Sequence, residues 1–74
     1  MRAMLYVRVD TTKHANAAAA QIRNDPAFSV VYVVPNKDYH IQAVTTDGAD
    51  VAACIERVDN VLNVTAVWSS HITG

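Results

Sequence analysis

The chain is short and close to neutral. It has 74 residues, of which six are basic, seven are acidic and one is a cysteine, and this length corresponds to one domain. These numbers exclude a second hydrophobic core, a disulfide framework and a zinc site of the common multi-cysteine type, and the charge balance argues against nucleic-acid binding, which normally uses a clustered basic surface.

The composition also predicts where the protein lies and how it gains stability. Residues 1–5 lack the basic region and apolar run of a signal peptide, and no apolar stretch reaches about 18 residues. We therefore expect a soluble cytoplasmic protein without membrane contact, in agreement with its single cysteine. A chain of this size buries only about 60% of its unfolded surface, so we expect association with another chain to add stability.

The N-terminal third predicts a strand followed by a helix. Residues 3–9 are apolar at nearly every position before Arg8, which is typical of a central strand covered on both faces. Residues 13–24 contain four consecutive alanines and have the highest helix propensity, and residues 10–12 (Asp-Thr-Thr) can cap this helix. Pro26 ends it, because the residue before a proline is pushed out of the α region. The helical spacing predicts a buried stripe of Ala15, Ala18, Ala19 and Ile22.

The middle of the chain predicts a β-hairpin. Residues 28–34 (Phe-Ser-Val-Val-Tyr-Val-Val) give the strongest strand signal. Pro35 cannot donate to a sheet and Asn36 tolerates a left-handed conformation, so residues 35–38 predict a turn. The chain then returns as strand 39–45, in which polar and apolar residues alternate.

The C-terminal third predicts a second helix and a last strand. Residues 46–48 start the helix, with Asp47 as its cap and Asp50 in its first turn, where the helix dipole favours a negative charge. Residues 60–63 end the helix, and residues 64–73 alternate as a strand with two unlike faces. The apolar stripe of this helix is Val51, Ile55, Val58 and Leu62.

The order of elements is strand, helix, strand, strand, helix, strand, which is the pattern of the ferredoxin-like α+β fold. Right-handed crossovers place both helices on one face of a four-stranded antiparallel sheet, and we expect residues 1–74 to form this single domain. The opposite face lacks a helical cover, so we predict homodimerisation through it. The sequence does not determine which alternate residues of each strand point to the uncovered face. The candidates for that face are Met4, Tyr6, Val30, Tyr32, Val67 and Trp68.

The hairpin and its flanks resemble a known family. The residues that carry the resemblance are Pro26-Ala27-Phe28, Val31-Tyr32, Val34-Pro35-Asn36-Lys37-Asp38-Tyr39, Asp47 at the start of a helix, and Leu62-Asn63-Val64 before a Thr/Ser-rich strand. In this pattern the chain is similar to the effector-binding domain of Lrp/AsnC-type regulators, also called the RAM domain. The resemblance covers essentially the whole chain.

The resemblance implies a domain that pairs through its sheets, assembles further up to octamers, and binds an amino acid or related metabolite between dimers near the turn. Asn36 stands where the family has glycine, and Lys37 stands at the variable position. Asp38 and Tyr39 stand where the family has Tyr-Asp, in inverted order, and Ser69 keeps one hydroxyl of a Thr-x-Thr pair. The implied ligand-binding residues are Asn36, Lys37, Asp38, Tyr39 and Ser69, with no metal or cofactor.

On this resemblance we expect a noncatalytic regulatory domain that modulates transcription or amino-acid metabolism. Full-length regulators of the family carry a helix-turn-helix domain ahead of this module, and none precedes Met1. We therefore expect either a stand-alone effector domain or a fragment, without direct nucleic-acid contact. Such a domain could also assemble with full-length Lrp/AsnC regulators.

Two alternative functions stay open. Small ferredoxin-like chains also dimerise as monooxygenases and isomerases, and Tyr39, His40 and His71 are available acid or base groups. We expect no enzyme, because the chain shows neither a nucleophile with an adjacent base nor a glycine-rich phosphate loop. The two histidines fall on strands about 10 Å apart, too far to share a metal within one subunit, and Cys54 is expected to be a packing residue.

The other alternative is a ligand-free oligomerisation module. It differs from the effector-binding domain only at the turn.

Overall fold

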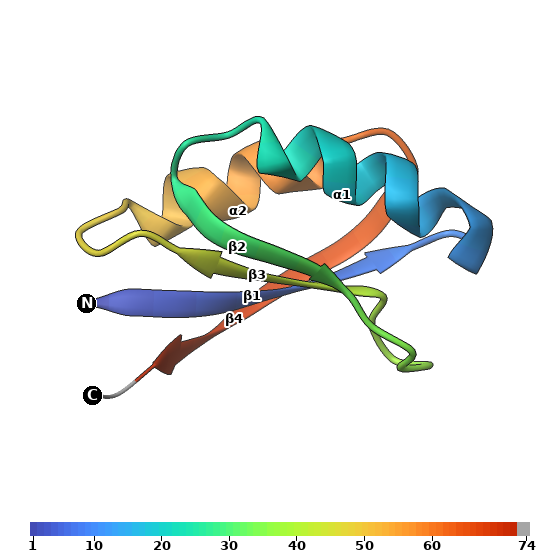
Figure 1. Cartoon of the computed structure of the whole chain (residues 1–74), viewed down its shortest axis with the longest axis horizontal. Coiled ribbons are helices and arrows are strands. Elements are labelled where there is room, and N and C mark those ends of the chain that lie inside the picture. The colour runs from blue at the N-terminus through green and yellow to red at the C-terminus, as the bar shows by residue number, and fades with distance from the viewer. Residues whose placement is uncertain (73–74) are drawn as a thin grey trace.

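The structure, a computed structural model, describes residues 1–72 as a four-stranded sheet with both α-helices on one face (Figure 1). The strands lie in the order β2-β3-β1-β4, and every neighbouring pair is antiparallel. This confirms the predicted ferredoxin-like fold. The predicted end of the last strand at Thr73 lies outside the described residues. The elements are β1 (Arg2–Val9), the 3-10 helix η1 (Thr12–His14), α1 (Ala15–Arg23), β2 (Phe28–Val33), β3 (Ile41–Thr45), α2 (Val51–Asp59) and β4 (Val64–Ile72).

Helix α1 packs on the sheet through small side chains. Its buried residues are Ala15, Ala18, Ala19 and Ile22, as its periodicity predicts. The α-helix begins later than predicted, because the preceding turn is a 3-10 helix whose N-cap, Thr11, makes no side-chain cap bond. The Asp10 carboxylate instead accepts a hydrogen bond from the Thr11 N–H (2.7 Å) and lies 2.6 Å from Nδ1 of His14. The predicted cap from residues 10–12 is therefore wrong.

Helix α2 is capped by Asp50 and not by Asp47. Oδ1 of Asp50 accepts a hydrogen bond from the Ala53 N–H at 3.2 Å, which satisfies a donor that the helix leaves unpaired. Asp47 lies in a turn with Gly48, whose φ is +82°, and precedes the N-cap residue Asp50 by three positions. Its carboxylate pairs with the N-terminal amine of Met1.

The buried face of α2 is shorter than predicted. Leu62 was expected to complete the apolar stripe, but its side chain is 73% exposed. The helix ends at Asp59, and Asn63 takes a left-handed conformation (φ 71°) that turns the chain into β4, so Leu62 leaves the helical spacing. The face toward the core consists of Cys54 and Val58, which are fully buried, with Val51 and Ile55 at its edges.

The pairing register decides which side chains face the helices. Leu5 is fully buried beneath them and pairs with Ser69 of β4, so both positions belong to the helix-covered face. Tyr6 pairs with Trp68 and therefore belongs to the opposite face. We call that opposite side the open face; it consists of Arg2, Met4, Tyr6, Arg8, Val30, Tyr32, Gln42, Val44, Ala66, Trp68, Ser70 and Ile72.

Two predictions about the sheet need correction. Val67 was a candidate for the open face, but it pairs with Val7 and packs against the core on the helix side. Strand β1 was expected to be covered on both faces. It is central in the sheet, but helices cover only one of its faces, and Met4 and Tyr6 on the other are half-buried.

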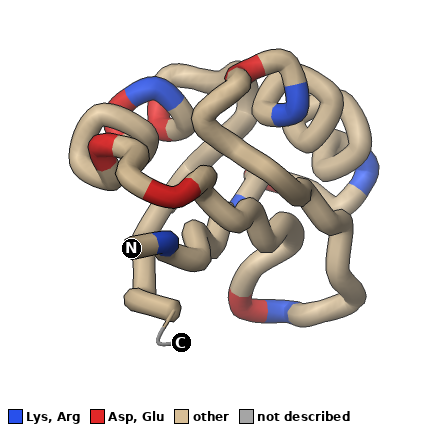
Figure 2. The backbone as a smooth tube through the Cα atoms, turned by 60° about the vertical axis from the view of Figure 1, so that its left-hand side comes forward, with Lys and Arg blue, Asp and Glu red and all other residues tan. Residues whose placement is uncertain are grey.

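The charged residues do not gather on one side of the molecule. Lysines and arginines are spread along the tube and are interspersed with aspartates and glutamates (Figure 2). Within residues 1–72, no helix is long and apolar enough to span a membrane.

Candidate functional site

The turn between β2 and β3 is closed by side-chain contacts. Oδ1 of Asn36 accepts a hydrogen bond from the Asp38 N–H at 2.8 Å, which is the geometry of an Asx turn. Nε of Arg8 donates to the carbonyl oxygen of Asp38, also at 2.8 Å. Asn36 does not take a left-handed backbone conformation. Its role in the turn comes from its side-chain oxygen and not from the left-handed conformation expected from the sequence.

An aromatic cluster joins this turn to the open face. The ring centroid of Tyr39 lies 4.9 Å from that of Tyr6, at an interplanar angle of 67°, and 6.1 Å from that of Trp68. Tyr6 and Trp68 are stacked at 5.9 Å. These distances and the edge-to-face geometry are favourable for aromatic pairs. The Arg8 guanidinium lies 5.4 Å from the centre of the Trp68 ring, within range of a cation–π interaction.

The structure brings together four of the five predicted ligand-binding residues. Asn36, Lys37 and Asp38 are exposed on the turn, and Tyr39 is half-buried against the open face. Ser69 stands apart, because it lies on the helix-covered face of the edge strand β4.

Arg8 is the residue that the sequence reasoning missed at this site. It contacts both the turn, through the Asp38 carbonyl, and the aromatic cluster, through Trp68. A signal for it was present, because Arg8 is the only charged residue between Ala3 and Val9. An isolated arginine near the end of an apolar strand commonly turns its charged group toward polar groups at the edge of the sheet.

His40, which precedes β3, and His71 on β4 lie at opposite ends of β1. Nδ1 of His40 accepts a hydrogen bond from the Val9 N–H at 3.1 Å, whereas His71 pairs with Ala3. The six-residue separation of these β1 partners corresponds to about 20 Å along a strand, so the histidines are farther apart than expected. Among residues 1–72, no group of three or more His, Cys, Asp or Glu side chains is placed to hold a metal ion.

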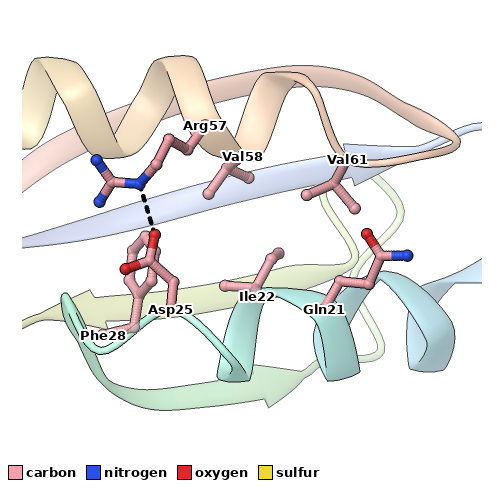
Figure 3. A pocket seen from close by; sticks show the side chains of 7 residues that line it. All are labelled: Gln21, Ile22, Asp25, Phe28, Arg57, Val58 and Val61. Atoms are coloured by element: carbon pink, nitrogen blue, oxygen red, sulfur yellow. Dashed lines mark hydrogen bonds and ion pairs between the residues drawn. The ribbon is translucent and has the colours of Figure 1, made fainter.

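A cleft separates the two helices on the other side of the sheet (Figure 3). Its volume is about 160 Å³, and an ion pair between Nε of Arg57 and Oδ2 of Asp25, 2.7 Å long, spans it. The hydrogen bond from Arg57 lowers the pKa of Asp25 below its ordinary value. The lining residues are Gln21, Ile22, Asp25, Phe28, Arg57, Val58 and Val61.

Cys54 lies beside this cleft and is fully buried. Nη2 of Arg57 lies 3.5 Å from its Sγ atom. Burial raises the pKa of the Cys54 thiol, an effect that exceeds the opposing one of the Arg57 charge. The neutral thiol is therefore favoured, and it is a weak nucleophile.

The fold and these features define a small ferredoxin-like domain whose open face carries an aromatic cluster joined to a polar turn. A solved structure of AsnC from E. coli is similar to it, with a TM-score of 0.76 and 11% sequence identity. The match covers 93% of this chain and 48% of that chain, so this chain spans about half the length of AsnC. At this identity the likeness shows the fold alone. No family model and no curated protein matches the sequence.

Proposed function

We propose that this chain is a noncatalytic effector-binding domain of the Lrp/AsnC type, which binds an amino acid or related metabolite and modulates transcription or amino-acid metabolism. The observation that carries the proposal is the likeness of nearly the whole chain to AsnC in fold, together with the family-like hairpin sequence at residues 34–39. A cytoplasmic location accompanies this function. Fold alone does not determine function, so the turn provides the specific support.

The turn offers polar groups on a fixed backbone. The Asn36 and Arg8 hydrogen bonds hold the main chain at Asp38, while the side chains of Lys37 and Asp38 are exposed. A carboxylate and an ammonium group in adjacent positions complement the amino and carboxylate groups of a free amino acid. We propose that the ligand is held here between dimers and favours one assembly state over another.

The open face supports homodimerisation. Tyr32 is 49% exposed and Trp68 is 36% exposed, although large aromatic side chains are usually buried to a greater extent in folded proteins. Pairing two open faces would bury these rings and the apolar residues around them, which is a favourable source of association. It would also supply the stability that a 74-residue chain needs. Octamers and co-assembly with full-length regulators are further proposals on the same basis.

Native mass spectrometry of the purified chain, with and without an equimolar pool of the twenty amino acids, tests the proposal. We expect the retained mass of one amino acid per subunit, or a shift from dimers to a larger assembly. The Asp38→Ala and Tyr39→Ala variants should weaken this binding without unfolding the domain. Asp59→Ala, which removes an exposed carboxylate at the end of α2, is the matched control.

The second candidate is a ligand-free oligomerisation module, which the aromatic open face favours in its own right. It predicts the same dimers but no response to the amino-acid pool. Assembly that ignores the pool would contradict the effector-binding function and support this module. If the wild type binds an amino acid and both turn variants bind it equally well, the ligand does not contact the turn.

A further inference from the structure

Strand β2 forms one edge of the sheet (Figure 1). Edge strands are commonly protected against pairing by charged residues, proline or a bulge. The sequence of β2, Phe-Ser-Val-Val-Tyr-Val, contains neither a charged residue nor a proline, and its irregular register lies at its start, between Phe28 and Val30. Residues 31–33 are therefore a regular stretch of strong strand formers at an edge.

The main-chain groups of Val31 and Val33 point away from the sheet. The Val34 N–H donates to the carbonyl oxygen of His40 at 2.9 Å, so these two residues are a hydrogen-bonded pair of the antiparallel ladder. Hydrogen-bonded pairs alternate with non-hydrogen-bonded ones. Tyr32 therefore turns its N–H and C=O toward β3, and Val31 and Val33 turn theirs outward.

Arg23 contacts one of these outward groups. Its Nη2 atom donates a 3.1 Å hydrogen bond to the carbonyl oxygen of Val31, and Arg23 itself lies in the last turn of α1. This contact agrees with the outward direction of the Val31 carbonyl. It also occupies an acceptor that a neighbouring strand would use, as charged side chains do at protected edges.

We infer that the edge of β2 binds the β2 edge of a second copy of this chain, antiparallel and about a two-fold axis at Tyr32. In this register Val31 of each copy pairs with Val33 of the other, and each pair exchanges both main-chain hydrogen bonds. Tyr32, which is 49% exposed on the open face, lies opposite Tyr32 of the other copy. Aromatic pairs across two strands add to the stability of such a ladder.

A second copy suits this edge because the register is self-complementary. A two-fold axis repeats every contact, so each favourable pair occurs twice. The pairing also shields Val33, which is 41% exposed. A strand of six residues is nevertheless much smaller than the roughly 20–30 residues that each partner contributes to a standard interface. The edge contact therefore adds to dimers formed through the open face and does not replace them.

The edge contact deepens the assembly part of the proposed function. It extends the sheet in its own plane, so the open faces of both copies lie on the same side and each can still pair with another open face. It provides a route from dimers to larger assemblies. Because the contact requires no added amino acid, its failure and the failure of effector binding are measured separately.

Oxidative cross-linking tests the register. In the two-fold arrangement the Cα atoms of residue 32 lie about 4.5 Å apart, within the roughly 4.4–6.8 Å that a disulfide spans. Gln42 lies beside Tyr32 on β3, so its two Cα atoms lie about 14 Å apart. We expect Tyr32→Cys to form a disulfide-linked dimer, and Gln42→Cys to do so at least about tenfold more slowly. The natural Cys54 is fully buried in both variants. Equal rates, or no cross-link in Tyr32→Cys, would overturn the inference.

Two further substitutions change the edge in opposite directions, each in the Tyr32→Cys protein. Val33→Pro removes an outward N–H that β3 does not use and should slow cross-linking about tenfold or more, whereas Val33→Thr keeps this donor and should not. Arg23→Ala releases the Val31 carbonyl and should speed cross-linking about three- to tenfold. Lys13→Ala, which removes an exposed charge before α1, is its control.

The two substitutions also protect the test against misfolding. If Val33→Pro fails to fold, Arg23→Ala carries the test, and a rate equal to that of Lys13→Ala would overturn the inference. Cross-linking that is equally fast in folded Val33→Pro and Val33→Thr would show that the copies do not meet at this edge.

Discussion

Arg8 and Asp38 join the end of β1 to the turn that follows β2. Nε of Arg8 donates a 2.8 Å hydrogen bond to the carbonyl oxygen of Asp38, and the same guanidinium lies 5.4 Å from the centre of the Trp68 ring on β4. One side chain thus connects three segments that are distant in sequence. The conformation of the turn therefore depends on the sheet and not only on its own residues.

Replacing Arg8 should loosen the turn. In Arg8→Ala we expect the amides of residues 37–39 to exchange with solvent roughly three- to tenfold faster, because one charge-assisted hydrogen bond to this backbone is lost. Hydrogen exchange measured by NMR checks this. Arg2→Ala is the control, since Arg2 lies on the same strand and face but at the other end. Equal exchange rates in the two variants would show that Arg8 does not hold the turn.

Removing Trp68 should weaken the proposed dimer. A tryptophan at the centre of an interface commonly contributes at least about 2 kcal/mol, so Trp68→Ala should raise the dimer dissociation constant by about thirtyfold or more. Sedimentation analysis over a range of concentrations measures this. Leu62→Ala removes a large side chain that is exposed outside the open face and should leave the dissociation constant unchanged. Dimers of equal strength in both variants would mean that the open face is not the interface.

The Asp25–Arg57 pair should make stability depend on pH. The pKa of Asp25 is lowered in the folded state, mainly by the hydrogen bond from Arg57. The stabilisation that Asp25 provides is therefore fully present above the ordinary aspartate pKa of about 4. It is lost as the pH falls through the lower pKa that Asp25 has in the folded state. Because Arg57 is half exposed, we expect the ion pair to contribute only about 0.5–1 kcal/mol to the free energy of unfolding.

Urea unfolding of the wild type and Asp25→Asn, from neutral pH to about pH 2, measures this contribution. The variant should be less stable near neutral pH, and the difference should shrink on acidification. Asp10 and Asp47, whose pKa values are also lowered by their partners, are present in both proteins, so their effects cancel in the comparison. A difference in stability that stays constant with pH would contradict the assignment.

The cap of α2 can be tested by a pair of aspartate substitutions. Asp50→Ala should reduce the free energy of unfolding by about 1 kcal/mol, because the Ala53 N–H loses its acceptor. Asp47→Ala should leave the free energy of unfolding nearly unchanged, because the partner of Asp47 is the exposed N-terminal amine. Chemical denaturation of both variants checks the order. A larger loss for Asp47→Ala would support the cap predicted from the sequence.

Some features of this protein follow from local sequence alone. The helical spacing of Ala15, Ala18, Ala19 and Ile22 predicts the buried face of α1 correctly, because a helix has a fixed period that needs no partner to define it. The order of strands and helices is likewise readable from propensity and turn residues, and it restricts the topology to the observed fold.

The faces of the strands were decided only by the tertiary structure. The pairing register shifts between Arg8 and Val9 and again between Phe28 and Val30. Each irregularity changes the parity of the residues that follow it, because strand side chains alternate with period two. Alternation within one strand therefore could not place Val67 on the helix side or separate Ser69 from the turn.

The candidate sites also required contacts between distant segments. Tyr39 meets Tyr6 and Trp68 only because β3 and β4 flank β1. Asp25 and Arg57 pair only because both helices lie on the same face of the sheet. Residue types and propensities determined the elements of this protein, whereas packing of the assembled sheet and helices determined which polar and aromatic groups come together.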